Sequence, residues 1–289
     1  MALTASVVLA VLFAALLHAG WNAWIKSGAD KELDTALVHS LGVIVALPML
    51  CFTGMPDRAS WPFVGASTAI HLGYYAALAG AYRHGDLGLT YPLMRGCAPL
   101  LVAVGTVAFV GDRLSGWAWA GVGTICAGVL MLGLAPGRSA SSASTRRGKA
   151  ILFALGNAFV IAAYTVVDGI GVRLSNQALA YVAALFLLDG VPYLLLVLWR
   201  RPGRRLDALR HMKSRWPIAL MATGASLGSY GIALWAMTRA PVAAVAALRE
   251  TSVLFAVVIG AVWLQEPFGW QRGSGTLVLV LGVVLLRSG

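Results

Sequence analysis

The sequence predicts an all-α polytopic membrane protein, with ten transmembrane helices arranged as two inverted five-helix repeats. Of the 289 residues, 59% are hydrophobic and only 11% are charged, whereas about 25% of the residues in a soluble domain are charged. The apolar residues form long runs, and features of the first half recur in the second. A soluble fold of this length cannot bury so much apolar side chain, so lipid is the expected solvent.

Each predicted span is a mainly apolar run of about 20 residues, which is the length needed to cross a bilayer. The spans are expected near 4–26, 34–54, 62–83, 88–110, 116–134, 149–171, 178–199, 216–237, 242–263 and 270–287. Residues 136–148 differ from these runs, because they are rich in Ser, Gly and Arg and have no apolar periodicity. This segment predicts a flexible linker between a first repeat at 1–135 and a second at 149–289.

Internal matches relate the two halves. With the halves in register, the matched pairs are Arg95 with Arg249, Leu100 with Leu254, Asp112 with Glu266, Gly121 with Gly275 and Gly128 with Gly282. Because each half contains an odd number of predicted spans, the second half enters the membrane from the opposite side. The matches therefore predict an inverted repeat, an architecture that is common among secondary transporters.

The Lys and Arg residues predict the orientation. Most of the 22 lie in connections that follow odd-numbered spans, above all in 200–215 and in the linker. The positive-inside rule then places the linker 136–148 and the loop 200–215 in the cytoplasm and both termini in the periplasm. The net charge of +11 does not indicate nucleic acid, because the basic residues lie in short segments between apolar runs and form no nucleic-acid-binding motif. The lipid bilayer is the expected partner.

Polar side chains inside the spans are the candidate functional residues, because such groups are costly in hydrocarbon unless they face a cavity or a partner. The candidates for a substrate cavity are His18, Trp21, Asn22, His71, Tyr75, Tyr82, Tyr91, Arg95, Asn157, Tyr164, Tyr230 and Arg249. The candidates for proton coupling or ion pairing are Asp168, Asp189 and Glu250. Aromatic faces next to hydrogen-bond donors suit a small zwitterion or an aromatic metabolite.

The two arginines inside spans allow two interpretations. Arg95 and Arg249 could contact the substrate, or they could be structural pins between the halves, paired with Glu250 or Asp189. Prolines on either side of Arg95 are expected to kink its helix, and transporters use such sites as hinges.

The repeated ends of the two halves resemble the tail of an EamA domain. The first tail is Gly111-Asp112-Arg113-Leu114 followed by Gly121 and Gly128, and the second is Gln265-Glu266-Pro267 followed by Gln271, Gly275 and Gly282. With two such tails around a central linker, essentially the whole chain resembles the ten-span branch of the drug/metabolite transporter superfamily. Asp112 stands where this family more often has Glu.

The resemblance implies a secondary transporter of the bacterial inner membrane that exports amino acids or related small metabolites by alternating access, and no enzymatic activity. An uptake carrier for a small anionic nutrient, using Arg95, Arg249 and Lys26, is an alternative. An intramembrane enzyme acting on a lipid or peptide is disfavoured, because the five histidines are dispersed and no nucleophile or metal motif is present. No cofactor or metal is expected, and a monomer suffices because one chain contains both halves.

Overall fold

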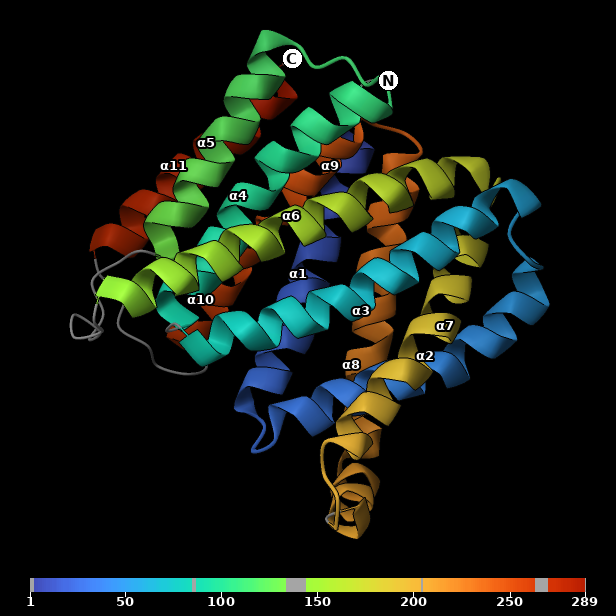
Figure 1. Ribbon diagram of the computed structural model, residues 1–289. Helices are drawn as coiled ribbons and strands as arrows, with labels where there is room; N and C mark the ends of the chain where they lie inside the picture. Colours follow the sequence, from blue (N-terminus) through green and yellow to red (C-terminus); the bar gives the residue numbers. More distant parts are fainter. Residues whose placement is uncertain (1–2, 85–86, 134–143, 204, 263–269, 289) are drawn as a thin grey trace.

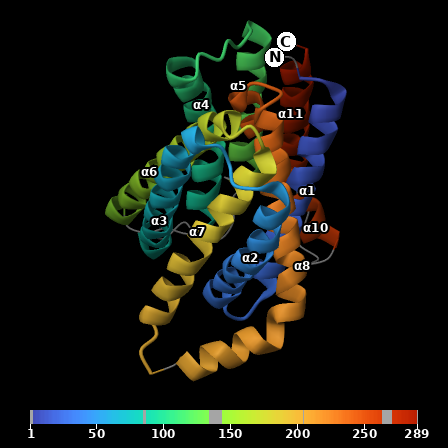
Figure 2. The same ribbon diagram turned by 90° about the vertical axis from the view of Figure 1, so that its right-hand side faces the viewer.

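The computed structural model is helical, with no strand, in the residues that it describes, which are 3–84, 87–133, 144–203, 205–262 and 270–288. Side chains are described in these ranges except at 72, 75–84, 87–92, 133, 144–147, 150, 260–261 and 272. The elements are α1 (Ala5–Ser27), α2 (Lys31–Thr53), the short 3-10 helix η1 (Arg58–Ser60), α3 (Trp61–His84), α4 (Leu87–Phe109), α5 (Gly116–Gly133), α6 (Ser144–Leu174), α7 (Ala178–Trp199), α8 (Arg205–Met237), α9 (Val242–Arg249), α10 (Ser252–Val262) and α11 (Trp270–Arg287). Figures 1 and 2 show them as a bundle of long, mutually tilted helices.

The membrane character of the fold is confirmed. Within the described residues, six helical segments are long and apolar enough to cross a membrane, and they lie in α1, α2, α6, α7, α8 and the pair α9–α10. The apolar parts of α4, α5 and α11 are shorter. A helix stands at each expected span, while the number of membrane crossings stays a prediction.

Three boundaries differ from the sequence expectation. α6 begins at Ser144, so the last residues of the expected linker are helical, and residues 136–143 lie outside the described residues. α8 begins at Arg205, so most of the expected loop 200–215 is helical. The expected span 242–263 is two helices, α9 and α10, separated by a break.

Helices that the sequence repeat makes equivalent pack in reciprocal pairs. α5 packs along its equivalent α11, and α2 packs along its equivalent α7. The contact of α3 with α6 in turn corresponds to the contact of α8 with α1. A Cβ atom on Gly121 would lie 2.5 Å from the backbone nitrogen of Leu286, and one on Gly275 would lie 3.0 Å from that of Leu132. These are the same approach made from each half, which favours the inverted repeat. The repeat itself stays a prediction, and Glu266 of the second tail lies outside the described residues.

Charged residues tie the chain connections together at one end of the bundle. Nη2 of Arg201, after α7, donates to Oδ1 of Asp30, before α2, at 3.0 Å, and this hydrogen bond lowers the pKa of the Asp30 carboxyl from its ordinary value. Nε of Arg215 in α8 donates to Oδ1 of Asp34 in α2 at 2.8 Å. The connections after the first and seventh spans therefore meet at this end.

A second cluster ties the opposite end. Arg173, near the end of α6, pairs with Asp112 at 3.1 Å and donates to the carbonyl oxygens of Met237 and Ala240 at 2.9 and 3.1 Å. The other carboxylate oxygen of Asp112 accepts from the backbone N–H of Val242 at the start of α9. The ends of α4, α6, α8 and α9 therefore meet here.

Candidate functional site

The break between α9 and α10 places two charged side chains inside the bundle. α9 contacts α1, α4, α5, α6 and α8, and its small Ala and Val side chains are buried throughout. At the break, the N–H groups of Glu250 and Thr251 donate to the carbonyls of Ala247 and Leu248, three residues earlier, at 3.0 and 3.1 Å. This tightened turn interrupts the α-helical pattern just after Arg249.

Arg95 of α4 and Glu250 at the break form a buried ion pair. Nε of Arg95 lies 3.1 Å from Oε2 of Glu250, and the two side chains are only 12% and 6% exposed. The structure therefore realises one of the two pairings that the sequence left open. The charge of Arg95 is neutralised by this partner.

Arg249 is placed differently from Arg95. Its Cζ atom lies 5.4 Å from the centroid of the Tyr230 ring, a cation–π distance. Among the described residues, no carboxylate forms an ion pair with the Arg249 guanidinium. Arg249 therefore carries the surplus positive charge of this part of the bundle.

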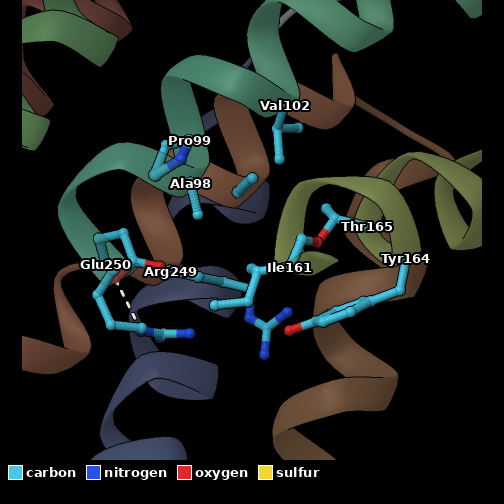
Figure 3. Close-up of a pocket in the computed structure, with 10 residues that line it drawn as sticks. Ala98, Pro99, Val102, Ile161, Tyr164, Thr165, Arg249 and Glu250 are labelled. Carbon is cyan, nitrogen blue, oxygen red and sulfur yellow. Dashed lines mark hydrogen bonds and ion pairs between the residues drawn. The ribbon is translucent and has the colours of Figure 1, made fainter. Parts of the chain in front are cut away.

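A small cavity opens beside these charges. It encloses about 20 Å³, which is room for about one water molecule. Figure 3 shows the side chains of Arg249 and Tyr164 directed into it. The lining residues come from α4, α6, α9 and the break that follows α9: Arg95, Ala98, Pro99, Val102, Ile161, Tyr164, Thr165, Ala246, Arg249 and Glu250. The space beside these charges is thus far smaller than a metabolite.

Asp168 fixes the ring on which Arg249 rests. The carboxylate is fully buried in α6, and one oxygen accepts the hydroxyl of Tyr181 from α7 at 3.0 Å. Its other oxygen accepts the hydroxyl of Tyr230 from α8. Asp168 therefore joins three helices and orients Tyr230.

His71 of α3 adds a second aromatic contact. Its ring stacks on Tyr164 with centroids 4.4 Å apart and planes inclined by 28°. Nδ1 of His71 lies 2.9 Å from the carbonyl oxygen of Ser67, one turn earlier. His71 thereby supports a wall of the cavity without lining it.

The polar residues of α1 lie together on their own helix. The rings of His18 and Trp21 meet edge to face with centroids 5.4 Å apart. Nε1 of Trp21 is buried and has no hydrogen-bond partner among the described residues. The Asn22 amide donates to the carbonyl of His18 at 2.7 Å, so this predicted binding residue is used within its helix.

Two predicted site residues belong to other contacts. Asn157 is fully buried, and its amide donates to the sulfur of Met94 at 2.8 Å, next to the cavity wall. Asp189 lies 3.6 Å from Nδ1 of His39, so it pairs between α2 and α7. The ion pair of Arg95 is with Glu250, and the pairing of an arginine with Asp189 stays a prediction.

Some predicted residues cannot be placed, and some lining residues were not predicted. The side chains of Tyr75, Tyr82 and Tyr91 lie outside the described residues. Thr165 lines the cavity, but sequence offered no sign that distinguishes it from other hydroxyl residues in spans. Among the described residues, no group of three His, Cys, Asp or Glu is placed to hold a metal ion.

Comparisons with known proteins address the family and the fold. Residues 148–288 match the model of the EamA-like transporter family. Matches to solved structures include 28 chains. One of them, titled only as the crystal structure of a protein, has a TM-score of 0.73 at 17% identity, over 97% of this chain and 98% of that chain. At this identity the likeness shows the fold alone. No curated protein matches the sequence.

Proposed function

The chain belongs to the drug/metabolite transporter superfamily through its EamA-like half, and on this premise we propose that it exports amino acids or related small metabolites by alternating access. Members of the family are membrane transporters, which sets the coarse function. The substrate, the direction and the mechanism are our proposal. Alternating access requires one binding site between two halves that rock against each other.

The observation that carries the proposal is the surplus charge of Arg249 at a broken helix. Transporters commonly build substrate sites at discontinuous helices near the middle of the membrane. Arg249 faces the cavity with no carboxylate partner among the described side chains, while Arg95 is neutralised by Glu250. A guanidinium binds a carboxylate through two parallel hydrogen bonds, so one substrate carboxylate would complete the charge balance.

The aromatic surroundings add a preference for the rest of the substrate. Tyr164 lines the cavity, and Tyr230 lies beneath the guanidinium of Arg249. Aromatic faces attract ammonium groups and pack against apolar side chains. An amino acid presents all of these groups next to its carboxylate.

The charge balance also bears on the anionic-nutrient alternative. That reading needs several free cations, but Arg95 is paired with Glu250. Lys26 lies at the end of α1, away from the residues that line the cavity. One surplus cation suits a single carboxylate better than a multiply charged anion.

The test is counterflow in proteoliposomes, with the purified protein and a panel of labelled amino acids and dicarboxylates. We expect amino-acid flux in the wild type and an apparent affinity about 30-fold weaker in Arg249→Gln, the factor for roughly 2 kcal/mol of charge-assisted binding. Arg249→Lys should lie between them, because it keeps the charge and loses the planar fork.

Arg239→Gln is the matched control, because its guanidinium also lies 5.4 Å from an aromatic ring, that of Trp235, but outside the cavity. This variant should transport normally. Flux of dicarboxylates alone, or full amino-acid flux in Arg249→Gln, would overturn the proposal.

A further inference from the structure

The first turns of α8 form a separate arm at one end of the bundle, which transport as proposed above does not use. We define the arm as residues 205–216. Pro217 follows it inside α8, and a proline within a helix removes a backbone hydrogen bond and bends the axis. Figure 2 shows the arm turned across the end of the bundle, away from the direction of the rest of α8.

One face of the arm docks on the bundle. Ala208 is buried in a cluster with Leu33 and Val197. One turn further, Nε2 of His211 lies 2.9 Å from Oδ1 of Asp34, which also accepts from Arg215. These contacts hold the arm in a fixed orientation on α2 and α7.

A second face is apolar and exposed. Leu206, Leu209 and Trp216 are 71%, 55% and 50% exposed, and their spacing places them on one side of a helix. Trp199, at the end of α7 beside the arm, is 73% exposed. Tryptophan is enriched where a membrane protein crosses the boundary between hydrocarbon and water, so the exposed apolar residues suit that level.

The same exposed side also carries basic residues, because Arg210 lies one turn after Leu206 and Lys213 one turn after Leu209. Arg205, Arg210 and Lys213 are exposed, and Asp207 is the arm's one acidic residue. Arg210 is 3.7 Å from Asp207, but both side chains are largely exposed, so water screens this pair. The face keeps a net positive charge at the end of the bundle where the basic residues of 200–215 gather.

We propose that the arm 205–216 is an interfacial helix that binds anionic lipid headgroups. Leu206, Leu209 and Trp216 lie toward the acyl chains, while Arg210 and Lys213 contact headgroup phosphates. Leucine and tryptophan exposed beside long basic side chains suit this position, because the basic side chains can extend from the apolar surface to the headgroups. Continuity with the span that follows Pro217 keeps the arm at the membrane surface, which favours lipid over a soluble partner.

The depth of the arm is tested with spin labels in vesicles of phosphatidylcholine and phosphatidylglycerol. Labels are attached to Leu209→Cys or Ser214→Cys in full-length protein whose three cysteines are replaced by alanine. Oxygen concentrates in lipid, so we expect the label at 209 to collide with oxygen more often than the label at 214 does. The label at 214 should collide more often with a water-soluble nickel complex than the label at 209 does. Equal, aqueous accessibility at both positions would overturn the interfacial placement.

The lipid preference is tested by titrating purified protein with phosphatidylglycerol or phosphatidylcholine and following its thermal unfolding. Each basic residue near an anionic surface strengthens binding about fivefold, so the double variant Arg210→Gln/Lys213→Gln should bind phosphatidylglycerol about 25-fold more weakly. The control is Arg58→Gln/Arg113→Gln, two exposed arginines at the opposite end, which should bind like wild type. Equal affinity in all three proteins would refute the proposal, as would equal response to both lipids.

Discussion

Arg95 reaches across the repeat to Glu250, with 3.1 Å between Nε and Oε2. Arg249 is the repeat equivalent of Arg95. Glu250 follows Arg249 in the sequence, whereas Gly96 follows Arg95. Among the described residues, two arginines and one carboxylate therefore line the cavity. This asymmetry leaves Arg249 as the surplus cation, on which the proposed binding of one substrate carboxylate rests.

The ion pair predicts a large stability effect. Glu250→Gln leaves the guanidinium of Arg95 buried without its counter-charge, and breaking a buried pair costs about 3–5 kcal/mol. We expect this loss of unfolding free energy in detergent, measured by titration with sodium dodecyl sulfate and circular dichroism.

A double variant separates the pair from general damage to the site. Arg95→Gln/Glu250→Gln removes both charges, so it should be more stable than either single variant. Additive losses in the double variant would show that the two side chains do not interact.

The buried carboxylate of Asp168 predicts a functional effect through Tyr230. Asp168→Asn weakens the acceptor of two tyrosine hydroxyls, and a hydrogen bond to a charged group contributes about 1.5–3 kcal/mol. Because Tyr230 supports the guanidinium of Arg249, we expect weaker apparent substrate affinity together with lower stability.

Two tyrosine variants tell these effects apart. Tyr181→Phe removes only the contact from α7 and should lower stability with little change in affinity. Tyr230→Phe should weaken substrate affinity as Asp168→Asn does. Equal affinity in Tyr230→Phe and the wild type would contradict a positioning role for Asp168.

Much of this arrangement could be predicted from sequence because lipid imposes strong patterns. The helix positions follow from apolar runs, and Arg95, Arg249 and Glu250 stand out as charges within those runs. The repeat placed the two arginines on corresponding helices, and the structure brings both to one cavity.

The rest depends on tertiary contacts that a linear pattern does not contain. The break after Arg249 falls at two ordinary-looking residues, Glu250 and Thr251, and no Pro or Gly marks it. The sequence predicts a loop at 200–215, where α8 begins at Arg205, because the charges of this segment obscure the helical spacing of its leucines. Asp189 looked equivalent to Glu250 as a buried acid, but only packing reveals that it faces His39.

The Asp30–Arg201 contact predicts a pH dependence outside the membrane core. The hydrogen bond from Arg201 lowers the pKa of Asp30, so its stabilisation is present above the unfolded-state pKa and is lost as the pH falls through the lower folded-state value. Arg201→Gln should therefore raise the midpoint of acid unfolding, in the range below pH about 4. Asp30 is 32% exposed, so the effect should stay under about 1 kcal/mol.

Arg200→Gln is the control for that measurement, followed by tryptophan fluorescence in detergent. Nη1 of Arg200 lies 3.8 Å from Oε1 of Glu32, a long contact, and the Arg200 side chain is 40% exposed. Its loss should therefore leave the midpoint of acid unfolding almost unchanged. Identical acid midpoints in Arg201→Gln and the wild type would contradict the assignment.

The contact of α5 with α11 predicts a steric effect at Gly121. A Cβ atom there would lie 2.5 Å from the backbone nitrogen of Leu286 and 2.7 Å from its Cα. Backbone atoms cannot swing aside as a flexible side chain does, so Gly121→Ala must push the helices apart. Overpacking of this kind costs about 1–3 kcal/mol, which should appear as lower resistance to sodium dodecyl sulfate.

Gly123 offers a matched comparison on the same helix. A Cβ atom at Gly123 meets nothing within 4 Å, and alanine favours a helix over glycine by about 1 kcal/mol. Gly123→Ala should therefore be neutral or slightly stabilising. Gly275→Ala, whose Cβ would lie 3.0 Å from the backbone nitrogen of Leu132, should destabilise like Gly121→Ala, because the two glycines make the same contact from opposite halves. If Gly121→Ala kept wild-type stability and Gly123→Ala lost it, the α11-facing side of α5 would be the one that carries Gly123, which contradicts the contact between Gly121 and Leu286.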